Sequence, residues 1–502
     1  MVHEKTLSKG IRSVFLLDLR ALALLRISLS LILMTDIIFR LSDLTAFYTG
    51  QGIMPLQALF RFHWNPFYFS FFTTNDNGYL QAVLFGTYFF CVCCLLVGYR
   101  TRLFTVLVWL FLMSVHNRNP LILQAGDHLL RMVVFWAMFL PWGYLLSLDS
   151  LKNVGGKKSY SYESFASLAY ICQIAFLYYF SALLKSSAEW RSEFTAIYYA
   201  LSIDQIIRPI GEILYPHYEF LRLLTAGTFY LELVLPLLLF MPFYNAWFRM
   251  GIIVGISLLQ LGIFLTMNVG LFTATAVVIL IGLLPTSFLD WIWSRFFRTI
   301  QSLKVFGIRL IQRFPSLKEG KSIAPPRPRP SAEIVAVIAL VYVLGWNMHT
   351  VGKKVIPDNL LWIGSLFKLH QHWGMFSPVV FKNDGWFIYA ATTQDGREID
   401  LNRKGVPLDY TKPKRVADLV KSDRWRKYGE LIIMKDNAHF RPYLCDFLIA
   451  DWNLSNPQSS VTHLKVIYMH EESLPGYRTA DVEPWDLCSC TAAPGSADDR
   501  KN

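Results

Sequence analysis

Long apolar stretches constrain the fold of this chain more than any other feature of its sequence. Several of them reach the roughly 17–25 residues that an α-helix needs to cross a bilayer. We identify nine candidate membrane-spanning segments, at about residues 19–40, 79–98, 102–115, 127–147, 164–184, 218–240, 246–266, 269–292 and 331–349. Because the backbone of a spanning segment must satisfy its hydrogen bonds internally, the pattern predicts an all-α multi-pass membrane bundle.

The composition fits a membrane location and excludes some functions. Hydrophobic residues make up 54% of the 502 residues, charged residues make up only 17%, and the mean hydropathy is +0.35. The formal net charge of +12 does not indicate a nucleic-acid partner here, since the basic loops of membrane proteins are retained on the cytoplasmic side. We therefore expect the lipid bilayer as a partner and no nucleic acid.

The Lys and Arg residues of the loops predict the orientation of the chain. If residues 1–16 are cytoplasmic, every loop that falls inside is basic, and the densest basic run is the Pro- and Arg-rich linker 294–330. The transmembrane domain then covers residues 17–293, a last transmembrane helix covers 331–350, and residues 351–502 are extracytoplasmic. This arrangement is typical of a protein of the inner (cytoplasmic) membrane of a cell.

The extracytoplasmic region is expected to form a small α+β domain. GWFIYAATTQDGREIDL is typical of two strands around a turn, and VTHLKVIYMH of a further strand. VADLVKSDRWRKYGEL and AHFRPYLCDFLIADW have the apolar spacing of amphipathic helices. A disulfide from Cys445 to Cys488 or Cys490 is expected if this region is exported. The C-x-C spacing suits no common zinc site, so we expect no metal.

Charged residues inside the predicted spans are costly, and each raises a question of function. Asp127 and Arg131 stand four residues apart, as in an ion pair on one helix face. Arg26 is expected to pair with Asp36 or Glu232 and to hold the bundle together. A functional role is the alternative for each, and for Glu232 both interpretations stay open.

Lys185 stands where a long apolar run ends, in the stretch YFSALLKSSAEW. One interpretation is an anchor whose ammonium group extends to the membrane surface. The other is a general base, because a lysine that is desolvated in a pocket loses its proton more easily. A pair with Glu189, one turn later, would oppose the second interpretation. The segment 185–217 is rich in aromatic residues, and we expect it to form a lid.

Five sequence pieces, in order, resemble the horizontally transferred transmembrane (HTTM) domain, which is shared with the vitamin K-dependent γ-carboxylase. The first is LDLRALALLRISLSLILMTDIIFRLSDLTAFYTGQGIMP, and the others are NRNPLILQAGDHLLR, YFSALLKSSAEWR, AIYYALSIDQ and LTMNVGLF. They cover roughly residues 17–285. HWGMFSP, further along the chain, resembles part of the extracytoplasmic module attached to many bacterial members.

The resemblance implies an activity and a site. The family's eukaryotic enzyme carboxylates protein glutamate with reduced vitamin K, O2 and CO2, and its base is a lysine at the end of a membrane helix. That lysine aligns with Lys185. The implied cofactor is a reduced quinol of the vitamin K or menaquinol type, and the implied substrate is a peptide or protein. The expected cofactor contacts are Met267, Asn268, Trp190, Tyr198 and Tyr199.

The chain also departs from the family pattern. The carboxylase has an assisting histidine at a position that falls near Tyr144 here, and no histidine stands between His128 and His217. A histidine that precedes the family's Met-Asn motif is replaced by Leu265. The large lumenal region of the animal enzyme is much reduced.

Three hypotheses follow from the sequence. The first is a quinol-dependent carboxylase or oxygenase with Lys185 as the base. The second is a non-catalytic membrane scaffold or export partner whose outer domain binds a peptide, a lipid or a protein. The third is a quinone-handling redox protein that uses Cys488 and Cys490, although their spacing is poor for thiol exchange.

Overall fold

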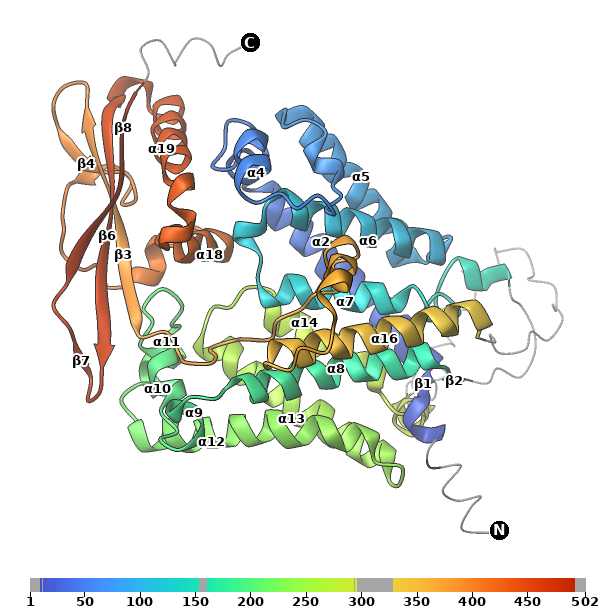
Figure 1. The fold of residues 1–502 in the computed structure, drawn as a ribbon. Coiled ribbons are helices and arrows are strands. Elements are labelled where there is room, and N and C mark those ends of the chain that lie inside the picture. The colour runs from blue at the N-terminus through green and yellow to red at the C-terminus, as the bar shows by residue number, and fades with distance from the viewer. Residues whose placement is uncertain (1–9, 11, 153–159, 293, 296–327, 493–502) are drawn as a thin grey trace, which may run out of the picture.

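The computed structural model describes residues 10, 12–152, 160–292, 294–295 and 328–492. Most of the predicted cytoplasmic segment 1–16 and of the linker 294–330 lies outside these residues. The described part consists of a helical bundle and, after it in the chain, a β-rich domain (Figure 1).

Six helices in the described part are long and apolar enough to cross a membrane. They are α2 (Leu19–Leu41), α5 (Gly78–Val97), α8 (Phe165–Leu184), α12 (Tyr218–Val234) continued by η4 to Phe240, α13 (Asn245–Thr266) and α16 (Pro330–Thr350). Each coincides with one of the predicted spans. The structure is therefore compatible with a multi-pass membrane protein.

The predicted number of nine spans is not confirmed. Helix α7 (Ala125–Ala137) has 13 residues, which is too short to span, and the chain then turns through Pro141, which cannot continue a helix. Helix α6 (Thr101–Arg118) ends in buried polar residues and is not among the six. The segment predicted at 269–292 is bent by 94° between Phe272–Leu283 and Thr286–Ile292, next to Pro285. Counting that bent pair as one span gives up to seven among the described residues.

The predicted α+β character of the C-terminal region is confirmed. An antiparallel sheet has the order β5-β4-β3-β6-β7, with β8 also on β6. Its strands are β3 (Asn383–Thr393), β4 (Glu398–Asp400), β5 (Val406–Pro407), β6 (Val461–Leu474), β7 (Arg478–Thr479) and β8 (Glu483–Thr491). Helices α18 (Asp423–Ile432) and α19 (Arg441–Ser455) lie between this sheet and the bundle (Figure 1). Strand β8 was not predicted.

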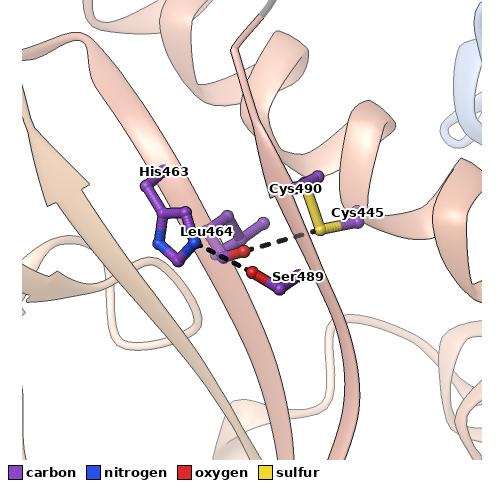
Figure 2. The surroundings of a disulfide bond; sticks show 5 residues. All are labelled: Cys445, His463, Leu464, Ser489 and Cys490. Carbon is purple, nitrogen blue, oxygen red and sulfur yellow. Dashed lines mark hydrogen bonds between the residues drawn. A yellow bond between two sulfur atoms is a disulfide. The ribbon is translucent and has the colours of Figure 1, made fainter.

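A disulfide joins Cys445 of α19 to Cys490 of β8, as Figure 2 shows. Of the two partners that the sequence left open, the fold uses Cys490, and Cys488 is a free thiol. Cys488 and Cys490 pair in regular register with Val466 and Leu464, so both side chains lie on one face of the sheet, and the fold places Cys445 beside Cys490. The redox hypothesis based on a Cys488–Cys490 couple is wrong for this oxidised state, because Cys490 is already bonded elsewhere.

Arg26 and Arg131 are buried, but the carboxylate partners predicted for them are wrong. The Arg26 guanidinium donates hydrogen bonds to the main-chain oxygens of Leu95 and Leu96, both at 2.6 Å. Arg131 donates to the main-chain oxygen of Lys368 at 3.0 Å. The last carbonyl groups of a helix have no partner within the helix, so the end of α5 can satisfy Arg26 without a carboxylate.

The carboxylates of Asp36 and Asp127 instead bind two other arginines. Arg40 donates to Asp36 at 2.8 Å and to Asp127 at 2.5 Å. Arg424 of α18 forms ion pairs with both carboxylates, at 3.2 Å for Asp127. The fold thereby uses carboxylates of the membrane bundle to hold the C-terminal domain against it.

Candidate functional site

A cavity of about 1140 Å³ lies where the membrane helices meet the C-terminal domain. Helices α8, α12 and α13 supply one part of its wall, the segment 185–217 a second part, and the C-terminal domain a third. Most of the lining side chains are apolar, and polar side chains from both the helices and the C-terminal domain also line it. This combination is typical of a ligand-binding site.

Lys185 lines this cavity at the end of α8. Its side chain is 3% exposed, so it does not extend to the membrane surface as an anchor would. The ammonium group forms an ion pair with the carboxylate of Glu232 and donates a hydrogen bond to Ser181 Oγ at 2.8 Å. The Trp190 ring covers it, with the ring centre 4.8 Å from Nζ. Lys185 is therefore buried against a carboxylate and an aromatic face.

The position of these groups follows from local structure. Ser181 precedes Lys185 by one helical turn, so both side chains lie on one face of α8. Glu232 is deep in α12, which packs against α8. In the described chain its carboxylate accepts hydrogen bonds from Lys185 and Ser181, which gives a partner to the mid-span carboxylate that the sequence could not assign.

Glu189 does not compete for Lys185. Its carboxylate pairs with Lys382 at 2.9 Å, in the segment that leads into β3. The hydrogen bond that the Lys382 ammonium group donates to Glu189 raises the pKa of Lys382. Glu189 therefore does not hold the proton of Lys185, as the sequence had allowed. Glu232 is the carboxylate that pairs with Lys185 instead.

The expected cofactor contacts separate into two groups. Trp190 and Met267 line the cavity. Asn268 is outside the lining: its main-chain nitrogen donates to Ile206 at 2.7 Å, and its side-chain oxygen accepts from Arg208 at 3.4 Å. Asn268 thus connects the end of α13 to the segment 185–217.

Tyr198 and Tyr199 also lie outside the lining and contact the C-terminal domain. The Tyr198 hydroxyl donates to the main-chain oxygen of Leu474 at 3.0 Å and accepts from the Tyr477 nitrogen at 2.8 Å. The Tyr199 ring lies 4.6 Å from the Lys382 ammonium group. Both tyrosines attach the segment to the domain.

The segment 185–217, which was predicted to form a lid, supplies part of the cavity wall. It forms three short helices, α9 (Ala188–Arg191), α10 (Ala196–Leu201) and α11 (Pro209–Leu214). Ile197, Leu201 and Ile206 are among the apolar side chains that it places on the cavity wall. Its apolar composition, unusual for a loop, is explained by this role.

The sequence did not predict the contribution of the C-terminal domain to the wall. His372, Asp384, Tyr468 and Trp485 all line the cavity. Burial lowers the pKa of His372. His128 of α7 lines the cavity as well, so two imidazoles face it. The position near Tyr144, where the resemblance to the carboxylase would place a histidine, has no histidine. The HWGMFSP motif was the one sequence signal for this contribution, but the residues around it did not indicate which part of the bundle it would contact.

Asp384 belongs to a group of three carboxylates with Asp204 and Glu471. Burial, and then the charge of Asp204, raise the pKa of Asp384 to about 7. Lys412 pairs with Asp204 at 2.6 Å and also with Glu471. A protein cation therefore already compensates part of the negative charge of this group.

No family model, no curated protein and no solved structure matches this chain.

Proposed function

We propose that the cavity is the active site of a quinol-dependent membrane enzyme of the carboxylase or oxygenase type, with Lys185 as its base. The observation that carries the proposal is the burial of Lys185, paired with Glu232, in a large, mostly apolar cavity that the segment 185–217 partly covers. The resemblance of the motif around Lys185 to the carboxylase agrees with it.

The residues present fit a quinol. The cavity is large enough for a ring with a long apolar chain, and its walls are mostly apolar. Lys185 and Glu232 would hold a ring hydroxyl, while Trp190 and Met267 would contact the ring. A bound reduced quinol would supply the electrons that activate O2.

The Lys185–Glu232 pair can hold and move one proton. The ammonium group and the carboxylate are in direct contact, so a proton can pass from Lys185 to Glu232 without an intervening group. The transfer leaves a neutral amine, which is the form that accepts a proton from a substrate hydroxyl. Glu232 holds the first proton meanwhile, and the segment 185–217 covers part of the cavity.

A second candidate is the non-catalytic scaffold. The Lys185 ammonium group is satisfied by Ser181 and Glu232, as in an ion pair that only stabilises the bundle. The outer domain would then bind a peptide, a lipid or a protein. Substitutions that keep the charge of Lys185 distinguish the two candidates.

The test uses purified protein in nanodiscs with reduced vitamin K, O2, labelled bicarbonate and a set of glutamate-containing peptides. The products measured are quinone epoxide and carboxylated peptide. Lys185→Arg keeps a charge opposite Glu232, but its guanidinium does not deprotonate, so we expect folded protein without product. Lys353→Ala is the matched control, since Lys353 is an exposed lysine shortly after the end of α16. Absence of product from the wild type, or full turnover by Lys185→Arg, would favour the scaffold.

The proposed location is the inner membrane, with the N-terminus in the cytoplasm and the C-terminal domain outside. The Cys445–Cys490 disulfide supports this orientation, because disulfides persist in oxidising compartments. A reporter enzyme that is active only outside the cytoplasm, fused after residue 502, tests it. An inactive reporter on a stably produced fusion would contradict the orientation.

A further inference from the structure

One face of α12 and one face of α13 line the same cavity. The lining residues recur every three or four positions on each helix, so each set forms a single stripe: Leu224, Gly227, Thr228 and Leu231 on α12, and Gly255, Leu258, Leu259, Gly262 and Ile263 on α13. The two helices are joined by η4, and each packs on another partner, α12 on α8 and α13 on α14 (Phe272–Val278). The stripes are therefore two walls of one apolar space.

Some residues of these walls are also exposed on the outside of the protein. Leu223 and Leu258 both line the cavity, yet they are 68% and 63% exposed. Gly227 and Gly262 line it as well and are exposed. A residue that lines a cavity and is largely exposed stands at its opening. Both helices are long and apolar enough to cross a membrane, so this opening faces lipid.

The charges of the cavity restrict what can enter through this opening. On the membrane side, the described lining carries Lys185 and Glu232, which neutralise each other. On the domain side, Arg426 and Lys427 are paired with carboxylates, both of them with Glu430. None of these cations is left to compensate a phosphate or carboxylate head group. An uncharged head with hydroxyl groups can instead exchange hydrogen bonds with the Lys185–Glu232 pair.

We propose that the gap between α12 and α13 is a lateral portal for a lipid with one long apolar chain and a small uncharged head. The chain lies between the two helix faces, and the head reaches Lys185 and Glu232. The portal rests on geometry and charge, and only the identity of the head as a quinol ring rests on the proposed function.

Four glycines provide a matched test of the portal. A Cβ added at Gly227, Gly262, Gly251 or Gly86 would meet nothing within 4 Å, so all four sites have room for a side chain. Gly227 and Gly262 line the cavity, whereas Gly251 of α13 and Gly86 of α5 are exposed and lie outside its lining. Tryptophan at the first two positions should obstruct the portal, and at the last two it should extend into lipid.

The probe is a geranylgeranyl hydroquinone with a diazirine in its chain, added to phosphatidylcholine nanodiscs. Photolabelled peptides are quantified by mass spectrometry. In the wild type we expect labels in residues 223–231 and 255–266. Gly227→Trp and Gly262→Trp should reduce labelling there by about fivefold or more, and the two control variants by less than about twofold.

Two outcomes would overturn the portal. One is equal labelling in the obstructed variants and the wild type. The other is displacement of the probe by oleate as effective as by unlabelled hydroquinone, which would show an anionic-head site. Both readouts measure binding, so they are independent of turnover. Labelling lost in the obstructed variants, together with full turnover by Lys185→Arg, would keep the portal and reject Lys185 as the base.

Discussion

Removing one partner of the Lys185–Glu232 pair should destabilise the protein by about 3–5 kcal/mol. The two side chains are only 3% and 7% exposed, so the remaining charge stays buried without a counterion. Lys185→Met leaves the Glu232 carboxylate facing Ser181 alone, and Glu232→Gln leaves the ammonium group without a charge partner. Both single variants should therefore lose several kcal/mol, much more than the interaction itself contributes.

The double variant Lys185→Met/Glu232→Gln should recover a large part of this loss. It contains no buried charge, and replacing a whole buried ion pair by groups of similar volume is often close to neutral. If the double variant loses no more than either single variant, the coupling free energy of the cycle is at least as large as one single loss, about 3–5 kcal/mol.

The assay is unfolding in mixed detergent micelles with increasing dodecyl sulfate, followed by tryptophan fluorescence. The matched control is the pair of Arg222 and Glu219 on the same helix, α12, whose side chains are 41% and 78% exposed. Arg222→Ala should cost less than about 1 kcal/mol. If Lys185→Met costs no more than Arg222→Ala, the pair is solvated, and the argument for a desolvated base is wrong.

Three further predictions test other parts of the fold. Arg424→Ala removes a cation from two buried carboxylates and should speed hydrogen exchange in α18. Arg415→Ala, which removes an exposed ion pair, should leave these exchange rates unchanged. Equal exchange rates in the two variants would contradict the role of Arg424 in docking the C-terminal domain. Because burial raises the pKa of Asp384 to about 7, the folded state binds its proton more tightly than the unfolded state, and this group makes stability fall as the pH rises from about 4 to about 7. Asp384→Asn should remove that fall in unfolding midpoints measured between pH 4 and pH 8, and an unchanged profile would reject the assignment. Cys445→Ser removes a disulfide that spans 45 residues and should destabilise the C-terminal domain by about 4 kcal/mol. Thermal unfolding of the variant and the wild type, with and without reductant, measures this loss. Equal stability of the two proteins would show that the disulfide does not form.

The elements that the sequence predicted well are those with a strong local signal. Helices α2, α8 and α16 begin and end within about two residues of the predicted spans, because length and apolar content alone define such helices. Strand β6 and the β3–β4 turn were also predicted, from alternation and from turn residues. The helix predicted at 127–147 was too long, because the apolar run continues past Pro141, and a proline inside such a run ends the helix.

The partners of the buried charges could not be predicted. Asp127 and Arg131 have the spacing of an ion pair, yet Asp127 binds Arg40 and Arg424, and Arg131 binds main-chain oxygens. The five N–H donors of an arginine can bind either a carboxylate or main-chain oxygens, so the residue type does not fix the partner. Arg424 also lies almost 300 positions from Asp127 in the chain. Local spacing contains no information about such a contact.

The sequence by itself determined that this chain is a membrane-type helical bundle followed by an α+β domain, and it singled out Lys185 at the end of an apolar run. Hydropathy, proline positions and strand alternation are local properties, so they can be recognised without a fold. Only the tertiary structure decided that Lys185 is buried against Glu232, that Glu189 binds Lys382 instead, and that His372 and Asp384 reach the same cavity. Burial and charge pairing depend on segments far apart in the chain, and the free energy of a buried lysine is set by the groups that surround it in space.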